Sequence, residues 1–206
     1  MASVVLSSVS LTESLLRLAR RVALLGVWAG GVLMIVTAFV VGFEVIGRKL
    51  FNVSTGGTDE IAGIALAIST AWALPLALLD RAHIRIDSLY ALLPTRAAAV
   101  LDLVGLTAFG LFTGMITWYG FTVVATSYRL GSRSLSAIGY PVVVPQFLWL
   151  AGFAFFLIVI VLLLIRGIVL FVQGDLRAAR GLIGSRTLDE ETADELADVT
   201  VRRDVP

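Results

Sequence analysis

The residues whose types could carry chemistry gather in residues 78–94, a polar interruption in a largely apolar sequence. This stretch holds the only histidine of the chain, His83, with Asp80 and Asp87 on either side of it. Imidazole and carboxylate groups could bind a metal ion or exchange protons, and a spacing of four residues places His83 and Asp87 on one face of a helix. One histidine among carboxylates is nevertheless a weak metal signal. We therefore favour an interfacial hydrogen-bonding role for His83 over the alternative, a small integral membrane enzyme built on these three residues.

The same stretch interleaves charge with apolar side chains, which indicates an amphipathic segment rather than a solvated loop. The apolar residues Ile84, Ile86 and Leu89 are interspersed along the chain with charged residues such as Arg81 and Arg85. A helix with arginines opposite an apolar face is suited to lying at a membrane surface. Guanidinium groups bind phosphate or carboxylate through two parallel hydrogen bonds, so Arg81 and Arg85 are candidates for contact with lipid headgroups.

The composition predicts an integral membrane protein. Of the 206 residues, 58% are hydrophobic and 15% are charged, and the mean hydropathy is +0.95. Soluble domains average about 25% charged residues. The absence of cysteine excludes disulfides and thiolate metal sites, and a single histidine excludes bis-histidine haem ligation within one chain. We expect no metal, no cofactor and no nucleic-acid partner.

Four long apolar runs separated by polar segments predict an all-α membrane fold with four transmembrane helices. A run of about 20 apolar residues is long enough to cross a hydrocarbon core ~30 Å thick. An amphipathic segment at 1–21 precedes the transmembrane domain at 22–166. The tail at 167–206 leaves the membrane after Arg166, and we expect it to be partly disordered, with a short acidic helix after a capping box that begins at Thr187. The expected helices cover about 22–43, 58–79, 96–127 and 142–165, with a connector from Glu44 to Gly57 after the first and the amphipathic segment between the second and third.

Local signals support these helix ends. Asp59 and Glu60 fall in the first turn of the second helix, where carboxylates suit the positive end of the helix dipole. Pro94 precedes the third helix, as is common at helix starts. Small residues four positions apart allow close helix contact, although glycine is also simply frequent in membrane helices. The candidate pairs are Gly26 with Gly30 and Gly110 with Gly114.

The distribution of cations predicts the orientation, because lysine and arginine near helix ends collect on the cytoplasmic side. Nine arginines fall on one side of the expected helices and four cations on the other. This count places both termini and the central amphipathic segment in the cytoplasm. The first group is Arg17, Arg20, Arg21, Arg81, Arg85, Arg96, Arg166, Arg177 and Arg180, and the second is Arg48, Lys49, Arg129 and Arg133.

Chemistry deep in the membrane is not indicated. A transport or proton site needs ionisable residues at mid-membrane depth, and the deepest candidates here are Glu44 and Asp102. For Asp102 we favour a structural role, such as pairing with an arginine near the interface. No phosphate-binding loop, catalytic triad or pair of broken helices is evident. Four apolar transmembrane helices without a buried polar site need a partner. A stand-alone channel or exporter is a further alternative.

Four segments of the sequence together form a recognisable signature. They are Gly47-Arg-Lys-Leu-Phe-Asn, Asp59-Glu60, Arg81-Ala-His-Ile-Arg-Ile-Asp-Ser-Leu before Leu93-Pro94, and Ile138-Gly-Tyr-Pro. With these segments the sequence resembles a known family, the small membrane subunit (DctQ-type, or Q subunit) of TRAP transporters, the tripartite ATP-independent periplasmic transporters. The resemblance covers about residues 20–170. One departure is Gly57-Thr58, where the family often has an aromatic residue before the acidic start of helix two. The resemblance implies that the signature or interface residues are Arg48, Asp59, Glu60, Arg81, His83, Asp87, Pro94 and Pro141.

The resemblance implies a non-catalytic subunit of a sodium-coupled secondary transporter in the bacterial inner membrane. In such transporters a large membrane subunit, the M type, carries the substrate and sodium sites, and a periplasmic substrate-binding protein, the P type, delivers an organic acid. The small subunit would scaffold the large one and help to dock the binding protein. Its partners would be these two proteins and the surrounding membrane lipids.

Overall fold

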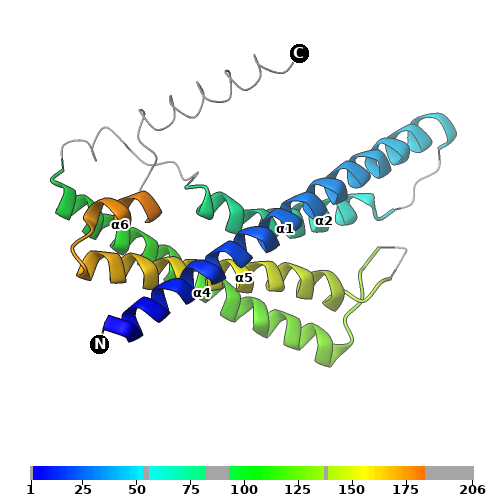
Figure 1. Ribbon diagram of the computed structural model, residues 1–206. Coiled ribbons are helices and arrows are strands. Elements are labelled where there is room, and N and C mark those ends of the chain that lie inside the picture. Colours follow the sequence, from blue (N-terminus) through cyan, green and yellow to red (C-terminus); the bar gives the residue numbers. More distant parts are fainter. Residues whose placement is uncertain (1, 53–55, 82–92, 137–138, 184–206) are drawn as a thin grey trace, which may run out of the picture.

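The computed structural model describes residues 2–52, 56–81, 93–136 and 139–183, and for residues 2–11 and 177 only the backbone. These residues form helices α1, α2, α4, α5 and α6, in that order (Figure 1). Within the described ranges there is no strand, only an isolated antiparallel bridge between Arg133 and Pro141.

Four helices in this part of the chain are long and apolar enough to cross a membrane, which confirms the predicted fold class. They are α1 (Ala2–Phe51), α2 (Thr58–Leu79), α4 (Thr95–Leu130) and α5 (Val143–Val172). The fifth, α6 (Leu176–Ile183), is a short amphipathic helix. The chain is therefore a multi-pass membrane protein.

The first helix is much longer than expected. The expected connector from Glu44 was wrong, because α1 continues without a break from Ala2 to Phe51. Fifty residues make a helix about 75 Å long, far more than one bilayer crossing requires. The helix ends where Asn52 adopts a positive φ of 57°. Arg48 and Lys49 lie in its last turn, where cations suit the negative end of the dipole.

The other helices also extend past their expected ends. Pro94, in an extended conformation, precedes α4, and its carbonyl accepts from the Ala98 N–H at 3.1 Å. Gly131 ends α4 in the left-handed region with φ 59°, where glycine carries no steric penalty. The helix α5 runs on to Val172, past its expected end at residue 165. The expected exit from the membrane after Arg166 stays a prediction. The expected acidic helix after Thr187 lies outside the described residues.

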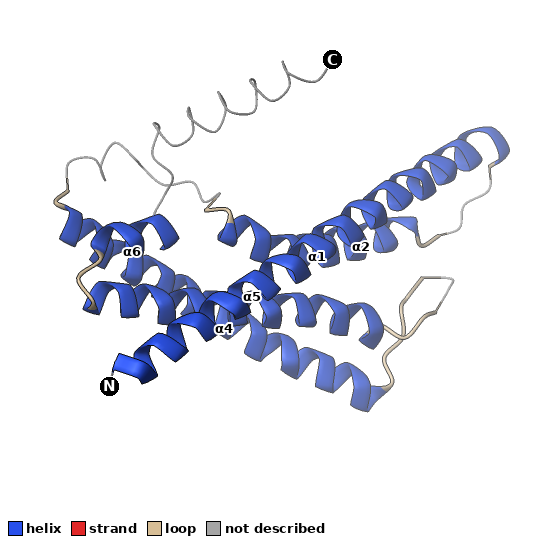
Figure 2. Cartoon of the chain, viewed as in Figure 1, coloured by secondary structure: helices blue, strands red, loops and turns tan. Residues whose placement is uncertain are grey.

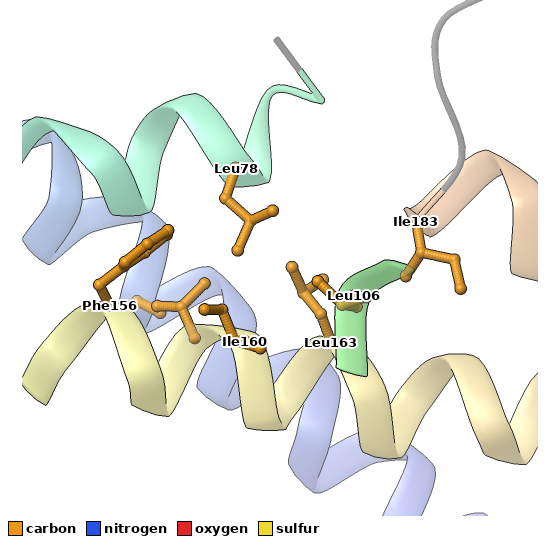
Figure 3. Packing of buried hydrophobic residues seen from close by; sticks show 8 residues of the cluster. Leu78, Leu106, Phe156, Ile160, Leu163 and Ile183 are labelled. Atoms are coloured by element: carbon orange, nitrogen blue, oxygen red, sulfur yellow. The ribbon is translucent and has the colours of Figure 1, made fainter. Parts of the chain in front are cut away.

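The helices form an open row rather than a closed bundle. α1 packs mainly on α2, α2 packs on α1 and α5, and α5 packs on α2 and α4 (Figures 1 and 2). The core lies where this row meets α6, around Phe156, Ile160 and Leu163 of α5 (Figure 3). Leu78 of α2, Leu106 of α4 and Ile183 of α6 close this cluster.

Small residues bring the helix backbones together, as membrane helices require in the absence of a hydrophobic force between them. A Cβ at Gly26 would lie 3.0 Å from the Trp72 ring, and one at Gly30 would lie 3.2 Å from the Ser69 Cα. The Ser69 hydroxyl donates to the Gly30 carbonyl at 3.1 Å. A Cβ at Gly110 would lie 3.0 Å from Ile160. Close contact is therefore confirmed for Gly26 and Gly30 and for Gly110, whereas Gly114 has only ordinary van der Waals contact.

Candidate functional site

One end of the molecule carries a polar cluster built from segments that are far apart in the sequence. We call this the outer cluster: Glu60, Ser134, Ser136 and Tyr140. The Tyr140 hydroxyl donates to Glu60 Oε1 at 2.7 Å, and the Ser134 hydroxyl donates a short hydrogen bond to Glu60 Oε2. The Ser134 and Ser136 hydroxyls lie 2.7 Å apart. The carboxylate in the first turn of α2 thereby joins that helix to the loop between α4 and α5.

The backbone of the α4–α5 loop holds these hydroxyls in place. The Ser134 N–H donates to the Tyr140 carbonyl at 2.9 Å, and the Val142 N–H donates to the Ser132 carbonyl at 3.2 Å. The Arg133 guanidinium donates to the Gly139 carbonyl at 3.0 Å, where Gly139 adopts a positive φ of 59°. The loop is therefore a short hairpin that presents Ser134 and Tyr140 to α2.

The electrostatics of the cluster favour a charged carboxylate and protonated donors. Glu60 is half-buried, and both of its oxygens accept from neutral hydroxyls. Hydrogen bonds to an ionised acceptor are stronger than those between neutral groups. Burial, and then the hydrogen bond to Glu60, raises the pKa of Tyr140, so its phenol stays a donor at neutral pH.

An apolar recess lies beside Glu60, between α2 and α5. Its volume is about 340 Å³, and Ile64, Pro145 and Trp149 are among the side chains that line it. Gln146 also lines it, and among the described residues the Gln146 Oε1 atom is buried with no hydrogen-bond partner. The outer cluster thus borders a concave surface of mixed character rather than an enclosed reaction chamber.

The structure brings together some of the residues predicted from sequence and separates others. Glu60 belongs to the outer cluster, and Pro141 follows Tyr140 in the same hairpin. Arg48 and Asp59 are exposed at the same end of the molecule, in the last turn of α1 and the first turn of α2 (Figure 1). Their predicted interface role stays a prediction.

The opposite end of the molecule contains ion pairs, which we call the inner pairs. Arg20 Nη2 lies 2.7 Å from Asp80 Oδ1, and Arg166 Nη2 lies 2.9 Å from Glu13 Oε1. Asp80 ends α2, and the chain turns at Arg81, which adopts a positive φ of 55°.

The central chemical hypothesis depends on residues that the structure leaves undescribed. His83, Arg85 and Asp87 lie outside the described residues, so neither their clustering nor the enzyme alternative is tested. Across the described ranges no group of three or more potential metal ligands comes together. Asp102 is only 1% exposed in α4, and its predicted structural pairing stays a prediction.

Several contacts of the candidate site were not predicted from the sequence. Tyr140 and Ser134 were part of a turn-rich connector, and their contact with Glu60 joins positions 80 and 74 residues apart. Arg20 was counted only for orientation, yet it pairs with Asp80. One sequence signal was available for the pair of Arg20 and Asp80. The first two expected helices run antiparallel, so the start of the first lies beside the end of the second.

A comparison with protein families decides the classification. The family model for tripartite ATP-independent periplasmic transporters, DctQ component, matches residues 37–170, which is 134 of the 206 residues. The chain belongs to the DctQ family. It is therefore a membrane component of a TRAP transporter, as the resemblance predicted. The matched range contains Arg48, the outer cluster and the core of α5, whereas Arg20 and α6 lie beyond it. No curated protein and no solved structure matches the chain.

Proposed function

We propose that the chain is the non-catalytic small subunit that scaffolds the large transport subunit and helps to dock the periplasmic binding protein. The observation that carries this proposal is the open row of helices, which leaves long apolar faces uncovered. On α1, Phe43 is 76% exposed and Trp28 is 74% exposed. Such faces suit contact with lipid and with the helices of another membrane protein.

The burial of polar groups supports a role without a transport site of its own. Among the buried residues of the described ranges, Asp102 is the one ionisable side chain; the remaining buried polar side chains are hydroxyls. A proton or ion path through the membrane normally needs several such groups at related depths. The coupling to sodium and the uptake of an organic acid would therefore depend on the large subunit.

The outer cluster supports the docking role. If the cation count sets the orientation, both termini lie in the cytoplasm of a bacterial cell and the outer cluster faces the periplasm. There Glu60 fixes the α4–α5 hairpin against α2, which gives an approaching soluble protein a rigid surface. Arg129, in the last turn of α4, and Arg133, on the loop that follows, are exposed and could meet carboxylates of the binding protein.

The test uses the assembled complex of this chain with its large subunit. Glu60→Gln should leave assembly nearly intact and weaken binding of the binding protein, because the amide is a poorer acceptor for two hydroxyls. Asp175→Asn, at an exposed carboxylate between α5 and α6 and away from the outer cluster, is the control. Binding is measured by surface immobilisation of the complex in nanodiscs. If the wild-type complex and both variant complexes bind the binding protein equally well, the docking role is overturned.

A further inference from the structure

We propose that the apolar groove between α1 and α2 holds one acyl chain of an anionic phospholipid, with its headgroup against Arg21 and Arg17. This groove is distinct from the outer cluster and has a volume of about 340 Å³. Its occupant is inferred from three properties of the groove: an apolar lining, a length that matches one leaflet, and exposed arginines at one end.

The groove lining offers a water molecule no side-chain hydroxyl that is free to bind it. Val22, Leu33 and Leu148 are typical of the side chains around the groove. Ser69 supplies its only side-chain hydroxyl, and this hydroxyl already donates to the Gly30 carbonyl. A bound water needs about two to four polar partners, and apolar cavities stay dry. In a protein that crosses a bilayer, the molecule at hand to fill such a groove is hydrocarbon.

The shape of the groove is fixed by close helix packing. Gly26 and Gly30 let α1 approach α2 so closely that a Cβ at either position would lie within 3.2 Å of Trp72 or Ser69. Both glycines line the groove. The Trp72 ring forms a wall, and its indole N–H donates to the Leu148 carbonyl at 3.0 Å. Because that bond holds the ring in one orientation, the groove is preformed.

The length of the groove indicates a chain from one leaflet. It follows α1 from Val22 to Leu33. At 1.5 Å per residue this is about 16 Å, close to half of a hydrocarbon core ~30 Å thick. An acyl chain of a single leaflet fits that extent, whereas a transmembrane helix of a partner would need contact over the whole depth.

The charge at the end of the groove selects the headgroup. Arg17 and Arg21 are exposed just before Val22, and Arg21 lies one helical turn before Leu25, which lines the groove. Arg20 is already paired with Asp80. The positive charge available to a lipid is therefore on Arg17 and Arg21, and guanidinium groups bind phosphate in a bidentate manner.

The first experiment blocks the groove. The full chain is placed in nanodiscs of phosphatidylglycerol and phosphatidylcholine in equal amounts, and retained lipid is counted by native mass spectrometry. Ala29 lines the groove and is exposed, so Ala29→Leu should reduce retained lipid and Ala29→Phe should reduce it further. Ala38→Phe, on an exposed position of α1 outside the groove lining, should retain as much as the wild type. The graded pair keeps the test valid if the larger side chain prevents folding.

The second experiment tests the headgroup. Arg21→Gln should lower the ratio of retained phosphatidylglycerol to phosphatidylcholine about fivefold, since each basic residue at an anionic surface contributes ~1 kcal/mol. Arg48→Gln, at the other end of α1, should leave the ratio unchanged. Undiminished lipid in Ala29→Phe, or an unchanged ratio in Arg21→Gln, would overturn the proposal. So would loss of the lipid on assembly with the large subunit, because the groove would then hold a helix of that subunit.

Discussion

The two ends of this membrane protein are held together by different kinds of interaction. At the outer end, Glu60 accepts from the hydroxyls of Ser134 and Tyr140, and all three groups are at least half-buried. At the inner end, Arg20 pairs with Asp80 and Arg166 pairs with Glu13. The exposed fractions of the side chains are 55% for Arg20 and 34% for Asp80, and 51% for Glu13 and 14% for Arg166, so each pair is partly exposed.

The two kinds of interaction differ in strength. Exposed ion pairs contribute about 0–1 kcal/mol and are screened by salt. Hydrogen bonds to a charged acceptor contribute ~1.5–3 kcal/mol each. We therefore expect the hydrogen bonds to Glu60 to hold the outer end more firmly than the ion pairs hold the inner end.

The largest expected effect concerns which end faces which compartment. A reporter that is active only in the cytoplasm should be active when fused after Arg180 and silent when inserted at Ser132. The physical reason is the excess of arginine at the inner end. The reverse pattern of activity would place the outer cluster in the cytoplasm and would rule out its role in docking a periplasmic protein.

Removal of the central carboxylate should destabilise the outer end most. Glu60→Ala leaves the Ser134 and Tyr140 hydroxyls without their acceptor and should lower the free energy of unfolding by more than the loss of either donor does. The measurement is unfolding in mixed micelles with increasing sodium dodecyl sulfate. Asp59→Ala, exposed in the same helical turn, is the control and should change stability by about 0.5 kcal/mol or less. Equal losses of unfolding free energy in both variants would show that the outer cluster stabilises the protein no more than an exposed carboxylate does.

Loss of one donor should have a smaller effect. Tyr140→Phe keeps the ring and removes the hydroxyl, so we expect a loss of ~1–2 kcal/mol at neutral pH. Because folding raises the pKa of Tyr140 above its ordinary value of 10.0, this contribution is present below about pH 10 and is lost as the pH rises through the folded-state pKa. The stability difference from wild type should therefore shrink in alkaline buffer. Tyr128→Phe, at an exposed tyrosine, should show neither effect.

The smallest effect is expected at the inner end. Arg20→Gln should cost ~1 kcal/mol or less, and the cost should fall as salt is raised because the Arg20 side chain of the pair is 55% exposed. Unfolding of this variant and of Glu60→Ala is compared at low and high salt, with Arg17→Gln as the control. If Arg20→Gln lowers the free energy of unfolding as much as Glu60→Ala does, and salt does not change this loss, the contrast between the two ends is contradicted.

Much of the fold was predictable because membrane helices are specified by local composition. The apolar runs located all four spans, and Gly26 and Gly110 marked points of close helix contact. The end of α1 was not predictable, because residues 44–51 are as compatible with a helix as with a connector until Asn52 turns the chain. The return of α6 onto the core depends on packing of Ile183, to which no local pattern pointed.

The candidate site was predictable only in part. Glu60 could be singled out at a helix start, but the choice of Ser134 and Tyr140 as its donors is a tertiary contact over more than seventy residues. Likewise, Arg20 could be assigned to one side of the membrane, while its pairing with Asp80 needed the packing of α1 on α2.

The most direct test of the scaffold assignment is flux through reconstituted vesicles. The chain alone, the chain with its large subunit, and both with the binding protein are compared for uptake of a labelled organic acid driven by a sodium gradient. We predict uptake only when all three proteins are present, because Asp102 is the one ionisable side chain buried within the described helices and an ion path normally needs several such groups. Sodium-driven uptake by this chain alone would contradict the assignment.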